Sequence, residues 1–102
     1  MTKQELINEL EVMSALRKNR IRVSNLVLQN EKNLLPLLKI VFNVDHKTSI
    51  KAAWVLEFVC TKKLDWLFLY LDYFSENIRN VHFDSAVRPI SKICQLLIKK
   101  TL

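Results

Sequence analysis

A single acidic residue lies inside the most apolar segment of the chain. Glu57 is embedded in IKAAWVLEFVCTKK, close to Trp54 and Phe58. A carboxylate in such a segment can act as a general acid or base. It can also pair with a Lys or Arg from the next unit of the helical repeat that is described below, which is the commoner arrangement for a buried charge. No nucleophile–base pair, Gly-rich phosphate loop or HExxH motif accompanies it. The sequence therefore predicts no catalytic residue.

Two histidines are the candidates for metal chemistry. His46 and His82 are 36 residues apart, and each lies near an aspartate, Asp45 or Asp84. These four side chains can hold a metal ion if the two segments meet across adjacent repeats. Two His without Cys fall short of the usual ligand spacing, so solvated turn residues are the favoured interpretation. The two cysteines stand apart without CxxC spacing and predict reduced, buried thiols; no metal or cofactor is expected.

Basic side chains are concentrated in the second helix of each of three predicted helical hairpins. Counted with the turn or cap residues that lead into each helix, such as Lys47 and Asp84, these segments hold twelve of the sixteen Lys and Arg residues and two acids. The rest of the chain holds four bases and eight acids. On the last helix, Arg88, Lys92 and Lys99 fall on one stripe opposite the apolar residues. A row of cations attracts polyanions or acidic protein surfaces. The predicted basic binding face consists of Arg17, Lys18, Arg20, Arg22, Lys47, Lys51, Arg88, Lys92 and Lys99.

A solvated face without a partner is the alternative interpretation of this charge. Bases favour helix C-termini because of the helix dipole, and Lys62, Lys63, Lys99 and Lys100 lie at such ends. A similar choice exists for the central aromatic cluster of Trp54, Trp66, Phe68, Tyr70, Tyr73 and Phe74. They can stack nucleobases, but few bases lie among them, so core packing is favoured. Any exposed part of this cluster would suit a partner protein or self-association.

Composition restricts the elements that position these residues. The chain of 102 residues has no glycine, and half of its residues are hydrophobic. Tight hairpin turns in sheets depend on glycine for positive φ angles, whereas turns between helices can use Asn, Asp and Ser. The length suits one domain, 1–102. We therefore expect a single all-α domain.

Caps and apolar periodicity predict six helices. The pattern TKQE predicts a capping box of Thr2 with Glu5, and Asn33 and Asp65 are expected to cap the third and fifth helices. Pro89 is expected near the first turn of the sixth helix and can bend it. The predicted helices cover about 3–13, 14–29, 34–42, 50–63, 66–74 and 85–100, and the boundary between the first two is the least defined.

The six helices pair as three antiparallel hairpins with a weak internal repeat. Asn33 and Asp65 are 32 residues apart, and Val59-Cys60 recurs as Ile93-Cys94 at a spacing of 34. On this pairing and period, the chain resembles HEAT/armadillo-like repeat proteins, which implies a short α-α superhelix whose second helices line a binding surface. A compact helical bundle fits the same pattern. The chain is also similar to short bacterial chains labelled adenylosuccinate lyase, although that family's Ser- and Gly-rich catalytic loop has no match here.

These observations lead to three functional hypotheses. The first is a non-catalytic scaffold or adaptor domain that binds an acidic protein partner through the basic face. The second is nucleic-acid binding through the same face, which the resemblance to HEAT-like DNA-repair proteins implies. The third is an enzyme. The start MTKQELINELEVM lacks a signal-peptide pattern, so a cytoplasmic location and no membrane partner are expected, while the uncapped end IKKTL leaves open that the chain is part of a longer protein.

Overall fold

Helices account for the regular secondary structure of this protein, as the sequence predicted. The computed structural model describes residues 1–101, and within that range it contains no strand. The α-helices are α1 (Lys3–Val12), α2 (Arg17–Val27), α3 (Leu34–Phe42), α4 (Ser49–Lys62), α5 (Leu64–Phe68), α6 (Leu71–Asn77) and α7 (Asp84–Thr101). Two 3-10 turns, η1 (Glu31–Asn33) and η2 (Ile78–Asn80), precede α3 and follow α6.

The start of α1 follows directly from its sequence. Thr2 Oγ1 accepts a hydrogen bond from the Glu5 amide at 3.1 Å, and the Thr2 amide donates to Glu5 Oε1 at 2.8 Å. These two bonds satisfy backbone donors that have no partner within the first turn of a helix. The hydrogen bonds to Thr2 lower the pKa of the Glu5 carboxyl. The predicted capping box is confirmed.

Of the two caps predicted for later helices, Asn33 is the N-cap residue of α3 but its side chain does not cap it, and Asp65 is not an N-cap. Asn33 makes no side-chain cap for α3, because its amide group donates instead to the carbonyl oxygens of Leu26 and Val27 at 3.4 and 3.3 Å. It thereby satisfies carbonyls at the end of α2. Asp65 lies inside the first turn of α5, which begins at Leu64. The correspondence between the two caps, which contributed to the predicted period, is therefore absent.

The predicted fifth helix is divided into α5 and α6. Tyr70 has φ −123° and ψ 24°, and the Leu69 and Tyr70 amides donate to carbonyls three residues back. This break lets α5 pack against α4 while α6 reaches α3. The Phe42 ring of α3 contacts the Tyr73 and Phe74 rings edge-on, with centroids 5.8 and 5.9 Å apart. The nearly all-apolar sequence WLFLYLDYF gives no period that locates the break.

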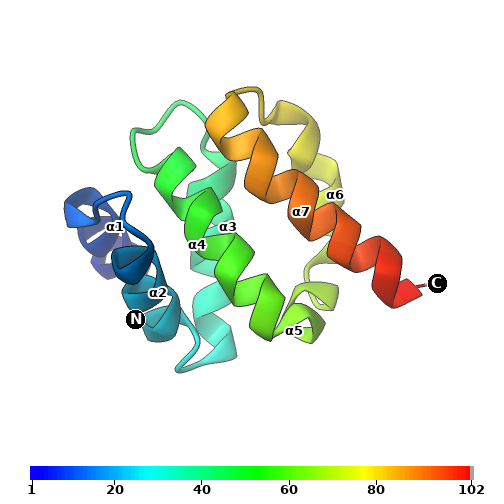
Figure 1. Ribbon diagram of the computed structural model, residues 1–102, viewed down its shortest axis with the longest axis horizontal. Coiled ribbons are helices and arrows are strands. Elements are labelled where there is room, and N and C mark those ends of the chain that lie inside the picture. The colour runs from blue at the N-terminus through cyan, green and yellow to red at the C-terminus, as the bar shows by residue number, and fades with distance from the viewer. Residues whose placement is uncertain (102) are drawn as a thin grey trace.

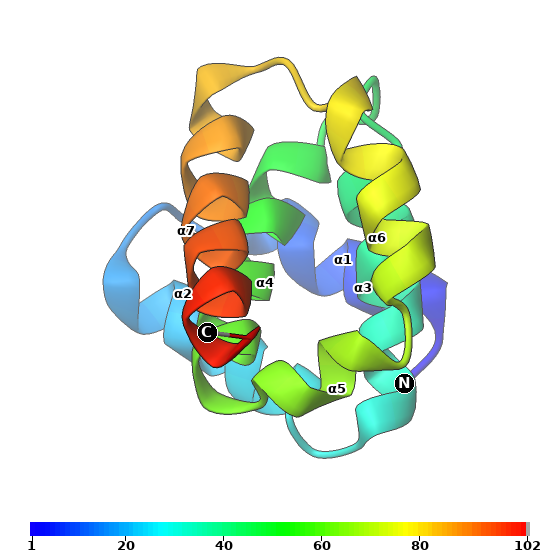
Figure 2. The same ribbon diagram turned by 90° about the vertical axis from the view of Figure 1, so that its right-hand side faces the viewer.

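The long helices lie in two layers. One layer contains α2, α4 and α7, and the other contains α1, α3 and α6 (Figures 1 and 2). Helix α4 is central, since it packs against α2 on one side, α7 on the other and α3 beneath. The chain alternates between the layers, which is the arrangement expected for three consecutive hairpins. A compact helical bundle also describes this packing.

The core lies between the layers. Leu37, Leu38, Leu56, Leu67 and Phe74 are among its largest side chains, and all are at most 1% exposed. Burial of such apolar side chains is the main source of stability in a domain of this size. The aromatic cluster divides accordingly: Trp66, Tyr70 and Tyr73 pack against this core, whereas Phe68 is 38% exposed.

Helix α7 continues through Pro89, which occupies its sixth position. A proline has no amide hydrogen, so the Ser85 carbonyl four residues earlier lacks its usual donor within the helix. The indole Nε1 of Trp54 in α4 donates to this carbonyl at 3.0 Å. One hydrogen bond thus satisfies the carbonyl and ties α7 to α4. Among the described residues, no helix has the length and hydropathy needed to cross a membrane.

Candidate binding face

Three hollows adjoin the outer side of α4, and all three include Glu57. The first lies between α2 and α4 with a volume of about 360 Å³. The other two lie between α4 and α7, with volumes of about 240 and 610 Å³. We call the surface that these hollows cover the α4 face. Its charged members among the described residues are Glu57, Arg17, Arg20, Lys62, Arg88, Lys92 and Lys99.

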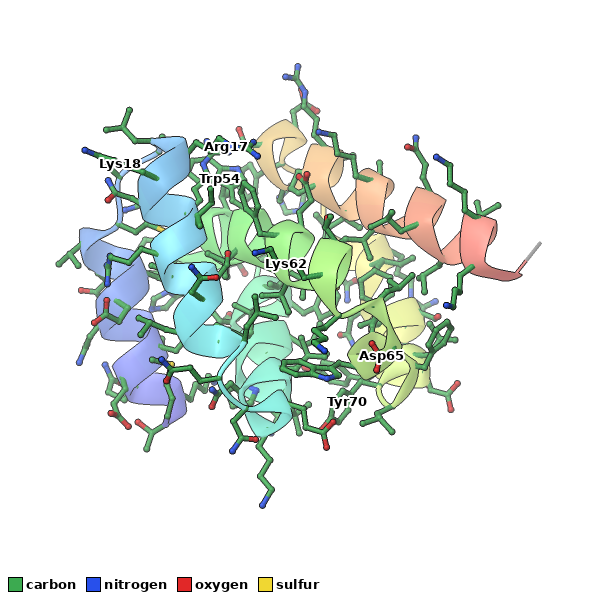
Figure 3. The ribbon with its side chains drawn as sticks, turned by 60° about the horizontal axis from the view of Figure 1, so that its bottom comes forward. Arg17, Lys18, Trp54, Lys62, Asp65 and Tyr70 are labelled. Carbon is green, nitrogen blue, oxygen red and sulfur yellow. The ribbon has the colours of Figure 1, made fainter. Side chains whose placement is uncertain are left out.

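Two arginines of α2 lie over aromatic rings of α4. The Arg17 guanidinium carbon is 5.2 Å from the centroid of the Phe58 ring, and that of Arg20 is 4.1 Å from the Trp54 ring. Arg17 and Arg20 are one turn apart, as are Trp54 and Phe58, so the two contacts form side by side. Attraction between a guanidinium and a ring face holds both side chains in place. Figure 3 places Arg17 beside Trp54, with Lys62 farther along α4.

The Arg20 side chain is the least satisfied of these groups. Its Nε atom is buried and has no hydrogen-bond partner among the described residues. Burial of a polar donor without a partner is unfavourable, and the contact with the Trp54 ring offsets part of that cost. Arg20 also lines the largest of the three hollows.

Glu57 makes its ion pair with Lys92 of α7. The Lys92 Nζ atom lies 3.6 Å from Glu57 Oε2, and the side chains are 65% and 27% exposed. This is the second arrangement considered for Glu57, a pair with a base from the following hairpin. The pair is long and partly solvated, so it contributes little to stability. Its position leaves Lys92 available to other anions.

The nine predicted basic residues fall into two groups. Arg17, Arg20, Arg88, Lys92 and Lys99 line the hollows of the α4 face. The side chain of Lys18 is exposed and points away from Arg17 and Trp54 (Figure 3). The remaining three, Arg22, Lys47 and Lys51, face acidic residues of α1.

The α1 corner, formed by Arg22, Lys47 and Lys51 with Glu9 and Glu11, pairs two of its three bases with carboxylates. Arg22 Nη1 lies 3.0 Å from Glu9 Oε2, and Lys47 Nζ lies 3.8 Å from Glu11 Oε2. Lys51 Nζ donates to the Glu11 backbone carbonyl at 3.2 Å. A separate hollow of about 200 Å³ lies beside Lys47 and Lys51. Arg22 and Lys47 therefore have carboxylate partners in α1, whereas among the described bases of the α4 face only Lys92 is paired with a carboxylate.

Sequence reasoning left three members of the α4 face out of the binding site. Lys62 was attributed to the helix dipole, yet it lines the first hollow with Arg17. Trp54 was assigned to the core, and Phe58 was considered only as a neighbour of Glu57. Both are only half-buried and support the arginines. A signal for this was present: positions 54, 57, 58 and 61 form one helical stripe that contains the only acid of α4.

The histidines make contacts close to them in sequence, and the cysteines are wholly or partly buried. His46 Nδ1 is 2.8 Å from Thr48 Oγ1, and His82 Nδ1 is 3.1 Å from the Asn80 carbonyl oxygen. The described residues contain no group of three His, Cys, Asp or Glu side chains placed to hold a metal ion. Burial raises the pKa of the Cys60 thiol to about 12 and also raises that of Cys94. Both thiols are therefore protonated, and weak as nucleophiles, at neutral pH.

Comparison of the chain with protein-family models, curated proteins and solved structures gives no match. The resemblance to HEAT-like repeats therefore rests on helix pairing and period alone.

Proposed function

We propose that this protein is a non-catalytic interaction domain that binds an acidic segment of a partner protein over the α4 face. The observation that carries the proposal is the charge around the three hollows, where six bases surround one carboxylate among the described residues. Such a concentration of cations beside partly apolar walls raises the local potential and attracts carboxylates. The bases that we assign to binding are Arg17, Arg20, Lys62, Arg88, Lys92 and Lys99.

The two stacked arginines are suited to planar anions such as protein carboxylates. Contact with Trp54 and Phe58 orients the guanidinium groups before binding, which lowers the entropy lost when a partner is bound. A guanidinium pairs with a carboxylate through two parallel hydrogen bonds. Arg17 and Arg20 are thus suited to bind Asp or Glu side chains at the edge of the first and third hollows.

Nucleic-acid binding is the second candidate, supported by the exposed row Arg88, Lys92 and Lys99 on α7. Two observations place it second. Single-stranded nucleic acids rely on free aromatic faces for base stacking, and the Trp54 and Phe58 rings each carry a guanidinium on one face. A phosphate chain crossing the hollows would also pass close to Glu57.

Charge reversal tests the proposal. Binding of a fluorescent poly-glutamate peptide is measured by anisotropy over a salt series, with the variant Arg17→Glu, Lys92→Glu, Lys99→Glu. The matched control, Lys18→Glu, Lys32→Glu, Lys39→Glu, has the same net charge but leaves the α4 face intact. We expect the first variant to lose at least about 30-fold in affinity and the control less than about threefold at 0.15 M salt.

Three results would contradict the proposal. Absence of binding by the wild type at low salt removes it. Equal losses in both triple variants would mean that net charge alone attracts the peptide. Tighter binding of single- or double-stranded DNA than of poly-glutamate, with a salt slope near −0.9 per phosphate contact, would favour the second candidate.

A further inference from the structure

The charges on the α4 face alternate across its width. Arg17 and Arg20 come from α2, Glu57 from α4, and Lys92 and Lys99 from α7. Because α4 lies between α2 and α7, the acid occupies the middle of the face (Figure 1). Lys62, five residues farther along α4, adds a base at one end of this middle row. A line drawn across the three helices at Glu57 therefore meets positive, negative and positive charge in turn.

We infer that the partner segment carries acidic side chains in two flanking rows and one basic side chain between them, which takes Glu57 over from Lys92. This inference rests on the proposed function and specifies the partner's charge pattern. Glu57 is then the residue that makes the α4 face bind such a segment more tightly than a uniform polyanion. The partner base, with Arg as the best fit, pairs with the Glu57 carboxylate.

The geometry of the Glu57–Lys92 pair permits the exchange. The atoms are 3.6 Å apart, and Lys92 is the more exposed partner. An exposed pair of this length is weak and is readily replaced. Once released, Lys92 joins Lys99 as a cation available to the partner's carboxylates. After the exchange, Glu57 is paired with the partner's base, and Lys92 is paired with one of the partner's carboxylates. Neither residue is left without an oppositely charged neighbour.

A uniform polyanion gains less from this face. A chain with a negative charge at every position places one beside Glu57, and repulsion between like charges opposes binding. A protein segment can place its only base at that point. Discrimination of this kind, by a repulsive element at the centre of an attractive surface, is a common source of specificity.

The spacing of cations on α7 indicates a helical partner. Arg88, Lys92 and Lys99 are separated by four and seven residues, which correspond to about 6 and 10 Å along the helix axis. A helix lying along α7 presents acidic side chains at the same intervals when they recur at four and seven residues. Docking of an amphipathic helix between two helices is a common mode of peptide recognition.

Two synthetic helical peptides test the inference. Both carry glutamates at the intervals of Arg88, Lys92 and Lys99, and their central residue is either Arg or Glu. Extra terminal glutamates in the Arg peptide equalise the net charge. Affinities are measured by anisotropy for the wild type, Glu57→Gln and Glu57→Arg, whose folding is checked by circular dichroism and thermal unfolding.

We expect the wild type to prefer the Arg-centred peptide by about tenfold or more. Glu57→Gln removes the preference, and Glu57→Arg reverses it. Equal binding of both peptides by the wild type overturns the inference and leaves the proposed function intact. A preference that persists in Glu57→Gln also overturns it, because another residue then reads the central base. Failure of both peptides to bind at low salt contradicts the proposed function itself.

Discussion

The inner side of α4 is apolar, whereas its outer side combines two aromatic residues with Glu57 and Thr61, and the two sides have different roles. On the inner side, Ala52, Val55, Leu56 and Val59 are fully buried against the core. On the outer side, Trp54, Glu57 and Phe58 are half-buried and adjoin the hollows of the α4 face. Apolar residues continue around the whole helix because α4 is the central member of its layer and has neighbours on three sides.

The comparison teaches that the neighbouring elements decide what an apolar residue does. The inner residues meet other apolar side chains, so their contribution is to stability. Trp54 and Phe58 meet arginines of α2, so they orient charged groups as well as fill space. The predictions below test whether stability and binding separate along this division of α4.

The largest expected effect is on the inner side. Leu56→Ala removes a fully buried side chain and leaves a cavity, so we expect unfolding in urea to require about 2–5 kcal/mol less free energy. Thr61→Ala on the exposed outer side is the matched control and should change it by less than about 0.5 kcal/mol. At a temperature where both variants are folded, peptide affinity should be unchanged by Leu56→Ala. A loss of affinity in the folded variant would break the separation of the two sides.

The second largest effect should be a loss of stability at alkaline pH, caused by the buried Cys60 on the inner side. Burial raises the pKa of Cys60 to about 12 from an ordinary value of 9.0, so the unfolded chain loses this proton first. Stability is therefore complete below about pH 9 and falls as pH rises toward 12, by up to about 1.4 kcal/mol per pH unit from this group.

Urea unfolding of the wild type and Cys60→Ala across this pH range isolates the contribution of Cys60. Other groups titrate in both proteins, so the difference between their slopes reports on the thiol. The variant should have the shallower slope. Identical slopes would mean that Cys60 is accessible to water, and the inner side would then be less tightly packed than its burial indicates.

Much of the fold could be predicted from the sequence. Absence of glycine indicated an all-helical chain, and the capping box at Thr2 and Glu5 fixed the start of α1. The break at Tyr70 could not be predicted, because residues Trp66 to Phe74 are mostly apolar and carry no period. Its cause is tertiary packing: α5 packs against α4, whereas α6 packs against α3. The side-chain bonds of Asn33 were equally dependent on packing, since they join η1 to the end of α2.

The sequence predicted most of the basic residues of the candidate site, but not which bases are paired with acids within the chain. Concentration of bases in the second helices identified five residues that line the hollows, Arg17, Arg20, Arg88, Lys92 and Lys99. The sequence could not reveal that Arg22 pairs with Glu9, because that contact depends on how α1 lies against α2. It also left the partner of Glu57 undecided, since a helical stripe specifies a direction but not the helix that it faces.

A moderate loss of stability is expected when the hydrogen bond between α4 and α7 is removed. Trp54→Phe keeps an aromatic ring, although a smaller one, and removes the donor to the Ser85 carbonyl, so we expect a loss of at least about 1 kcal/mol in the free energy of unfolding. In a Pro89→Ala background, the new amide can donate to the same carbonyl within α7. The loss caused by Trp54→Phe should then be smaller, as a double-mutant cycle in urea would measure. Equal losses in both backgrounds would mean that the indole bond does not substitute for the missing proline amide.

The smallest effect should come from the pair at the centre of the outer side. Glu57 and Lys92 are 3.6 Å apart and partly exposed, so a double-mutant cycle with Glu57→Gln and Lys92→Met should give a coupling free energy below about 1 kcal/mol that declines with added salt. If the outer side serves binding rather than stability, either single substitution should leave unfolding almost unchanged. A salt-independent coupling above about 2 kcal/mol would place the pair in the stabilising framework of the domain. Lys92 would then be unavailable for exchange, and the division between the two sides of α4 would no longer hold.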